Sequence, residues 1–132
     1  MTLSQKQQRF ALMVCELIAW AHANGYELTF GEAYRTEEQQ KLYVKSGYSK
    51  TMESKHLDRL AVDFNLFIGG QYVTDAAAYR PLGERWEKLG GRWGGRFGVK
   101  LEEYAVKVGW DANHFEYGDG VDRTHPLTGG GL

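Results

Sequence analysis

The sequence predicts an α+β fold in which a small antiparallel sheet packs against helices. From Ser4 to about Ala23, apolar residues recur at near-helical spacing, which indicates an opening helix. Residues 61–68, Ala-Val-Asp-Phe-Asn-Leu-Phe-Ile, form an apolar run that indicates a buried strand. Gly69-Gly70 separates this run from the strand-like residues 71–73, and a glycine pair there is typical of a hairpin between antiparallel strands.

Length and composition indicate one globular domain over residues 1–132. With 42% hydrophobic and 25% charged residues, the chain is large enough to bury a core without disulfides. The last segment, 118–132, is rich in Gly, Asp and Thr and is expected to be a loosely packed tail. The single cysteine, Cys15, cannot form an intramolecular disulfide, which fits a reducing compartment, and its apolar neighbours predict a buried side chain.

The charge balance argues against nucleic acid and anionic membranes as partners. The chain carries 16 basic and 17 acidic residues, a net charge of -1. No segment is long enough to span a bilayer, and the N-terminus lacks an apolar core followed by a cleavage site. We therefore expect no nucleic-acid partner, no stable membrane insertion and no secretory signal peptide, and we expect a monomer.

A further strand and helix are predicted before the buried strand. Residues 26–30 alternate as in a strand, and Thr36 is a plausible N-cap of a helix with acidic residues in its first turn. Arg35 lies at the junction between them. It either aims its guanidinium at an anionic ligand or forms a surface salt bridge, for which the nearby carboxylates are Glu32, Glu37 and Glu38. The polar segment 46–54 is expected to be a loop that forms one wall of a cleft.

After the hairpin, a helix is expected to begin around Pro81 and to end at Gly90-Gly91. Residues 92–98, Arg-Trp-Gly-Gly-Arg-Phe-Gly, interleave aromatic, basic and glycine residues, as a nucleic-acid surface would. The near-neutral net charge favours instead a tight loop whose Trp93 and Phe97 pack on the sheet or line a cleft. A last short strand is expected at 114–117.

Asp63 raises the question of a metal site. A carboxylate within an apolar strand must be paired, hydrogen-bonded or bound to a metal. His56 precedes this strand, and Asp111 and His114 lie three residues apart near the last one. Two histidines and one carboxylate can hold a zinc ion with an open position for water. Spacing alone leaves a second interpretation open, with a surface His56, a hydrogen-bonded Asp63 and a histidine in the core at 114.

The motifs resemble those of a known family. Ser54-x-His56, Ala61-x-Asp63 and Asp111-x-x-His114 occur in the order found in the zinc D-alanyl-D-alanine carboxypeptidase and L-alanyl-D-glutamate peptidase superfamily, especially the short endolysins of bacteriophages. The segment 34–36, Tyr-Arg-Thr, matches the arginine segment of that family. The similarity covers roughly residues 30–116. It implies a fold like that of the D,D-peptidases and Hedgehog, with the zinc site in a cleft on the sheet.

The resemblance also implies a role for each residue. His56, Asp63 and His114 are expected to bind Zn²⁺, and Asp111 is expected to act as general base. Arg35 would bind substrate and stabilise the oxyanion. Two neighbouring residues have two expected roles each: Ser54 would bind substrate or orient His56, and Glu116 would hydrogen-bond a metal ligand or face solvent. The sequence departs from the family at Arg59, which replaces a glycine and leaves room for a turn of different shape.

The expected function is hydrolysis of peptidoglycan by a phage or prophage endolysin that cuts the L-alanyl-D-glutamate bond of the stem peptide. Such a protein would be made in the host cytoplasm and would act on the cell wall, in the periplasm, after another factor had opened the membrane, which leads to host cell lysis. Two alternatives remain at this point: a D-Ala-D-Ala carboxypeptidase, and a non-catalytic zinc-bearing module that binds wall peptide.

Overall fold

Strand β2 (Ala61–Ile68) is the central strand of the sheet. In this computed structural model, which describes residues 1–47, 54–118, 121–122 and 130–131, β2 pairs antiparallel with three other strands. Its second half pairs with β1 (Tyr26–Phe30) and β3 (Gln71–Val73), and its first half pairs with β5 (His114–Glu116). Strand β4 (Arg92–Trp93) adds to the far side of β5. The expected hairpin at Gly69-Gly70 is confirmed, since both glycines have positive φ.

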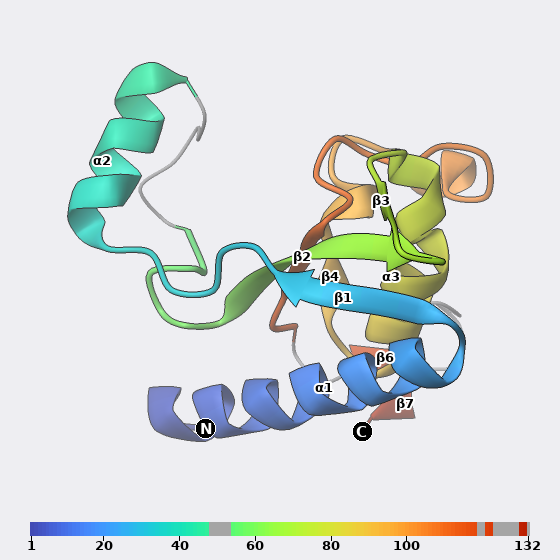
Figure 1. Ribbon diagram of the computed structural model, residues 1–132. Coiled ribbons are helices and arrows are strands. Elements are labelled where there is room, and N and C mark those ends of the chain that lie inside the picture. The colour runs from blue at the N-terminus through green and yellow to red at the C-terminus, as the bar shows by residue number, and fades with distance from the viewer. Residues whose placement is uncertain (48–53, 119–120, 123–129, 132) are drawn as a thin grey trace.

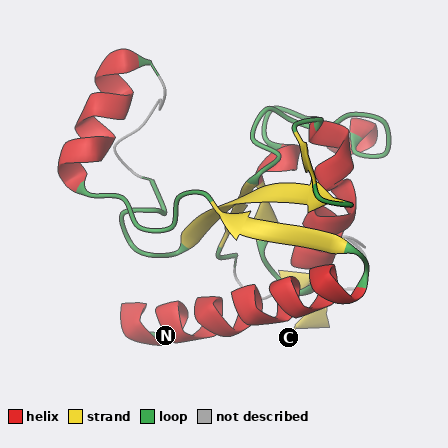
Figure 2. Ribbon diagram, viewed as in Figure 1, coloured by secondary structure: helices red, strands yellow, loops and turns green. Residues whose placement is uncertain are grey.

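The two faces of β2 differ in chemistry. Val62, Phe64 and Leu66 are at most 2% exposed and belong to the core. This core packs against α1 (Leu3–Ala23) and α3 (Arg80–Lys88), as Figures 1 and 2 show. Alternation places Asp63 on the other face. The apolar run had indicated that Asp63 is surrounded by the core. It is not, and its side chain is 14% exposed.

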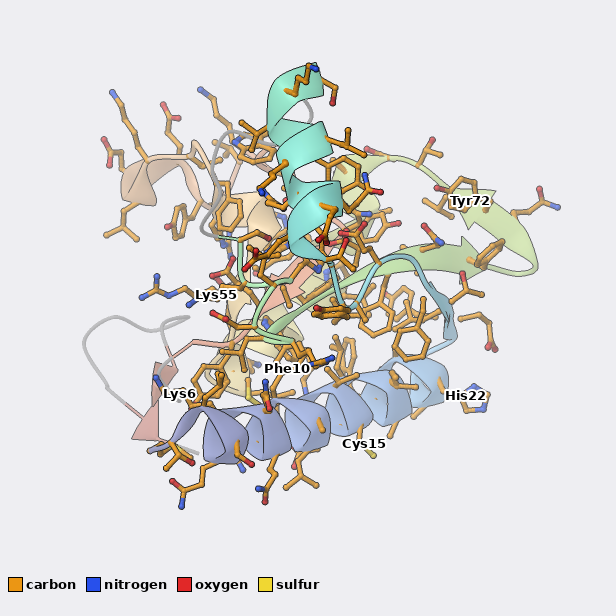
Figure 3. All side chains as sticks on the ribbon, turned by 90° about the vertical axis from the view of Figure 1, so that its left-hand side faces the viewer. Lys6, Phe10, Cys15, His22, Lys55 and Tyr72 are labelled. Carbon is orange, nitrogen blue, oxygen red and sulfur yellow. The ribbon has the colours of Figure 1, made fainter. Side chains whose placement is uncertain are left out.

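Helix α1 buries one stripe of side chains. Its buried residues recur every three or four positions and are Phe10, Met13, Leu17 and Ala21. Its N-cap is Thr2, which forms a capping box with Gln5, so the helix begins slightly before the expected Ser4. The prediction of a buried Cys15 is wrong, because this position lies on the face away from the buried stripe and is exposed (Figure 3).

Helix α2 (Glu37–Ser46) projects away from the rest of the molecule (Figure 1). Its N-cap is Thr36, as predicted, and Gln40 is the buried residue of this helix. None of the helices in the described ranges is long and apolar enough to cross a membrane.

The segment around Trp93 is only partly a loop. Arg92–Trp93 forms the edge strand β4, and a 3₁₀ turn follows at Gly94–Arg96. Trp93 is 1% exposed and donates from Nε1 to the carbonyl of Ala112 at 2.6 Å. A Cβ at Gly83 would lie 2.0 Å from the Trp93 ring, so α3 can pack on this tryptophan only because it has glycine there. Burial of Trp93 therefore agrees with the prediction, whereas the loop assignment of residues 92–93 is wrong.

Some predictions fall on residues that the structure does not describe. The loop predicted at 46–54 is outside the described residues from 48 to 53, and so is most of the predicted tail. Within the tail, β6 (Val121–Asp122) pairs antiparallel with β7 (Gly130–Gly131). The single-domain organisation and the loose packing of the tail stay predictions.

Candidate metal centre

The pairing of β2 with β5 brings Asp63 and His114 together. The two residues are direct partners in the antiparallel register, so their side chains share the face opposite the core. His114 Nδ1 lies 3.2 Å from Asp63 Oδ1. On the core face, the neighbouring pair is Val62 and Phe115, both at most 2% exposed. Burial of that apolar pair sets the register, and the register places the polar pair.

His56 reaches the same point from the turn before β2. Its Nδ1 lies 2.9 Å from the carbonyl oxygen of Ala33, which requires an N–H at Nδ1 and leaves Nε2 with its lone pair. Nε2 lies 3.4 Å from Asp63 Oδ1. The ring of His56 is 2% exposed and meets the ring of His114 edge-on at 5.1 Å. A surface position for His56 is therefore wrong.

Glu116 holds the second histidine. It follows His114 by two residues on β5, so both side chains point to the same face. Glu116 Oε1 lies 2.8 Å from His114 Nε2, which leaves Nδ1 directed at Asp63. Glu116 was expected either to hydrogen-bond a metal ligand or to face solvent, and in the structure it contacts the candidate ligand His114. The strand alternation of His-Phe-Glu was the signal for this contact.

These residues fit a metal ion. The nitrogen atoms of His56 and His114 and an oxygen atom of Asp63 all lie within 4.8 Å of one another. A tetrahedral zinc ion with bonds of about 2.0–2.2 Å separates its ligand atoms by about 3.3–3.6 Å. The distances of 3.2 Å and 3.4 Å from Asp63 to the two histidines are close to that spacing. Each histidine also has an oxygen partner on its other nitrogen, as metal-bound histidines do.

The charges of the site favour a cation. Burial alone would raise the pKa of Asp63, but hydrogen bonds with His114 and His56 outweigh it and lower that pKa from 3.8 to about 2. For His114, burial would lower the pKa, but hydrogen bonds with Asp63 and Glu116 raise it from 6.5 to about 9. Three carboxylates lie around His114, namely Asp63, Asp111 and Glu116. Their negative charges favour a positive charge at this place, either a proton on His114 or a metal cation.

Asp111 lies beside the candidate ligands without joining them. A tight turn, closed by the 3.0 Å bond from the His114 amide to the Asp111 carbonyl, brings Asp111 Oδ2 to 3.8 Å from His114 Nδ1. Burial raises the pKa of Asp111 above 3.8, and the charge of His114 partly opposes this. A Cβ at Gly94 would lie 2.0 Å from the Asp111 carbonyl oxygen, so glycine is required where the neighbouring 3₁₀ turn approaches. The carboxylate is 30% exposed and thus accessible to water.

Arg35 is buried in a polar network beside His56. It is 7% exposed, and its Nε donates to Glu32. Its Nη1 donates to Gln40 Oε1 at 2.6 Å, and Tyr43 donates to the other oxygen of Glu32 at 2.9 Å. The pairing with Glu32 agrees with one of the two interpretations, but the pair is not a surface salt bridge. No sequence pattern had indicated Gln40 or Tyr43 as partners.

Ser54 lies between Arg35 and His56. Its Oγ accepts from the backbone N–H of His56 at 3.2 Å and lies 3.4 Å from Arg35 Nη1. The backbone N–H of Arg35 in turn donates to the carbonyl of His56 at 3.2 Å. These contacts fix the turn that carries His56. Binding of substrate by Ser54 or Arg35 stays a prediction.

Arg59 keeps the backbone conformation that glycine favours. Its φ is 58°, and it is the one non-glycine residue with positive φ in the described part of the chain. The guanidinium lies 4.1 Å from the centre of the Tyr34 ring, a cation–π contact that offsets part of the backbone strain. The turn before β2 therefore has a glycine-like shape although the residue is arginine.

This conformation predicts the effect of two substitutions. Arg59→Gly is expected to change the free energy of unfolding by less than about 1 kcal/mol, because relief of about 1–2 kcal/mol of left-handed strain offsets the lost cation–π contact and the flexibility of glycine. Arg59→Val is expected to destabilise by about 2 kcal/mol, since a β-branched residue tolerates positive φ poorly. Urea unfolding measures both, and equal stabilities of the two variants would contradict the assigned conformation.

Comparison with known proteins gives a matching family model and a phage protein that is similar in sequence. Residues 47–117 match a family model described as D-alanyl-D-alanine carboxypeptidase. A protein of Listeria phage A118, named L-alanyl-D-glutamate peptidase, is 39% identical over 90 residues, which cover 61% of this chain and 31% of that protein. The chain thus spans about a third of the length of this relative.

Solved structures confirm the fold. The L-Ala D-Glu endopeptidase ChiX of Serratia marcescens aligns with a TM-score of 0.60 at 22% identity, over 76% of this chain and 74% of its own. The vancomycin resistance D,D-pentapeptidase VanY, solved as a variant in complex with Zn(II), aligns with a TM-score of 0.54 at 24% identity, over 83% and 70% of the two chains. The α+β arrangement predicted from the sequence is that of these structures.

Proposed function

Because the chain belongs to the family described as D-alanyl-D-alanine carboxypeptidase, we propose that it is a zinc-dependent peptidase of peptidoglycan that cleaves the L-alanyl-D-glutamate bond of the stem peptide. The observation that carries the proposal is the convergence of His56, Asp63 and His114 beside the carboxylate of Asp111. The choice of bond rests on the name of the phage relative at 39% identity. As an endolysin, the protein would act on the cell wall after the membrane had been opened.

Each residue has a separate task in this mechanism. His56, Asp63 and His114 would hold the zinc ion, which when bound would supply a Lewis acid for the peptide carbonyl and lower the pKa of water. Asp111 accepts the proton of the attacking water and later passes it to the leaving amine. The raised pKa of Asp111 suits both steps. It makes the carboxylate a stronger base for accepting the proton of water, and the carboxylic acid that results can donate this proton to the leaving amine.

Arg35 would stabilise the negative charge that develops on the carbonyl oxygen. Its guanidinium is held by Glu32 and Gln40, so little side-chain entropy is lost when substrate binds. Burial raises the pKa of Asp111, and the positive charge of Arg35 is the smallest of the effects that oppose this rise. Ser54 would act mainly by fixing His56 and Arg35 relative to each other.

Digestion of purified peptidoglycan tests the proposal. The zinc-loaded protein is expected to release fragments with a new amino terminus on D-glutamate, identified by mass spectrometry. A chelator should stop the release, and added zinc should restore it. Free D-alanine without new D-glutamate termini would favour a D,D-carboxypeptidase instead, which the family description and the likeness to VanY support. No new termini at all would contradict an enzyme and favour a wall-binding module.

Glu116 offers a test of the metal centre itself. Glu116→Gln keeps the size of the side chain but replaces the carboxylate that orients His114. Loss of such an outer partner typically lowers metal affinity by about 10–100-fold. Zinc competition with a chromogenic chelator measures this change, and Glu102→Gln, an exposed carboxylate elsewhere in the chain, is the control. Unchanged affinity in Glu116→Gln would contradict the arrangement.

A further inference from the structure

Trp110 is a large aromatic residue at the surface next to the candidate base. It precedes Asp111 directly and is 70% exposed, whereas Trp86 and Trp93 are at most 1% exposed. Leaving an indole largely in water forgoes burial free energy that a tryptophan otherwise contributes to folding. Trp110 therefore presents an aromatic surface directly beside the candidate base.

Trp110 is connected to the metal centre through one aromatic ring. The ring of Phe97 lies 5.6 Å from the ring of Trp110 and 5.6 Å from the ring of His114. Phe97 is half-buried, and its ring is tilted by 52° against the ring of Trp110 and by 49° against the ring of His114. Phe97 thus links the ring of the candidate ligand His114 to the ring of the exposed Trp110.

The backbone holds Trp110 in this place. The amide of Gly109 donates to the carbonyl of Gly95 at 2.5 Å, and a Cβ at Gly109 would lie 2.2 Å from the carbonyl oxygen of Phe97. Arg80 and Arg96 both donate to the carbonyl of Tyr104, at 2.7 Å and 3.0 Å, and so tie down the segment that leads to Trp110. A platform that is already ordered loses little entropy when a ligand stacks on it.

We propose that Trp110, supported by Phe97, is a stacking platform for the sugar ring to which the stem peptide is attached. This inference rests on the proposed function. In peptidoglycan the L-alanine is joined through a lactyl group to a hexosamine, so a sugar lies within about two residue lengths, roughly 7 Å, of the L-alanyl-D-glutamate bond. The terminal D-alanines of the same peptide lie several residues further away.

The chemistry of the platform favours sugar over peptide. The face of an indole ring carries partial negative charge and attracts the polarised C–H groups on the face of a sugar ring. The next residue of the stem peptide, D-glutamate, carries a carboxylate, which would lose its hydration without gaining a partner on an aromatic surface. Trp110 thus makes the enzyme select stem peptides that are still attached to glycan.

Two ligands that differ only in the sugar test this inference. One is the disaccharide pentapeptide that a muramidase releases from peptidoglycan, and the other is the pentapeptide that keeps the lactyl group on its L-alanine but has no sugar. Zinc-loaded protein is expected to show a kcat/KM about tenfold higher for the sugar-linked substrate, as one aromatic contact of about 1.4 kcal/mol would give. Trp110→Ala should reduce this ratio to about 1, and Trp110→Phe should keep part of it. Equal losses on both substrates in Trp110→Ala, or no preference in the unaltered protein, would overturn the inference.

A binding measurement separates this inference from the proposed function. Calorimetry on zinc-loaded Asp111→Asn protein compares the affinities of the two ligands without turnover. One outcome is that the unaltered protein cleaves neither ligand, that the sugar-linked ligand still binds about tenfold more tightly, and that Trp110→Ala abolishes this difference. The inference about Trp110 would then hold, and the peptidase proposal would fail. Equal affinities overturn the platform whatever the cleavage result. Tyr72→Ala is the control, because Tyr72 (labelled in Figure 3) is also an exposed aromatic residue, at 57%. Its partner in the sheet is Phe67, near the end of β2 opposite to the end that carries Asp63.

Discussion

Replacement of Asp111 by asparagine is expected to lower kcat by about 10²–10⁴-fold, the usual contribution of a general acid–base group, and to leave zinc bound. Asparagine keeps the shape of the side chain but cannot accept the proton. The zinc content is expected to stay at one per chain, because Asp111 lies 3.8 Å from His114 and is not one of the three candidate ligands. Hydrolysis of purified peptidoglycan and metal analysis of the same sample measure the two quantities.

The matched control for this variant is Glu102→Gln, which removes an exposed carboxylate from the 3₁₀ turn at Leu101–Glu103. It should leave both kcat and zinc content unchanged. Loss of zinc in Asp111→Asn would show that Asp111 is a metal ligand. Full activity with zinc bound would show that Asp111 does not transfer the proton.

The variant His56→Ala is expected to lose the metal and, with it, the activity. Removal of a ligand should lower zinc affinity by more than the roughly 100-fold that loss of an outer partner costs. The empty position also leaves Asp63 with one imidazole partner in place of two, so the remaining carboxylate is less well compensated. Zinc titration by calorimetry and circular dichroism, to check that the chain is folded, give the answer together.

His22→Ala is the corresponding control. His22 lies near the end of α1, its side chain is 77% exposed, and its one ion-pair contact is with Glu27 at 3.6 Å, within the part of the chain described (Figure 3). This variant should bind zinc as the unaltered protein does. A folded, active His56→Ala protein without zinc would refute the metal mechanism.

The residues of the candidate site were predictable because their motifs resemble those of a known family, whereas spacing alone left a second interpretation open. Two histidines, a strand carboxylate and an aspartate three residues before the second histidine are a small set, and the motif around them supplied their order. The local elements were also predictable where capping and alternation act within a few residues. Strand 26–30, the Thr36 N-cap and the turn at Gly69-Gly70 are examples.

Contacts between distant residues could not be read in the same way. Asp63 and His114 are 51 residues apart, and only the pairing of β2 with β5 makes them neighbours. The exposed position of Cys15 depends on which stripe of α1 is buried, and that stripe was set by Phe10, Met13 and Leu17, which belong to the core shared with α3 and the sheet. Arg92–Trp93 is a strand because it pairs antiparallel with β5, which lies far away in the sequence.

By itself, then, the sequence determined which side chains are available for a metal and a base, and which short segments become helices and strands, since both depend on residue type and on neighbours along the chain. The tertiary structure decided that Asp63 faces away from the core and that Glu116 contacts His114. It also decided that Arg35 is buried against Glu32 and that Trp110 is exposed beside Phe97. The physical reason is that these arrangements follow from strand register and from the burial of the opposite face, which the whole chain settles together.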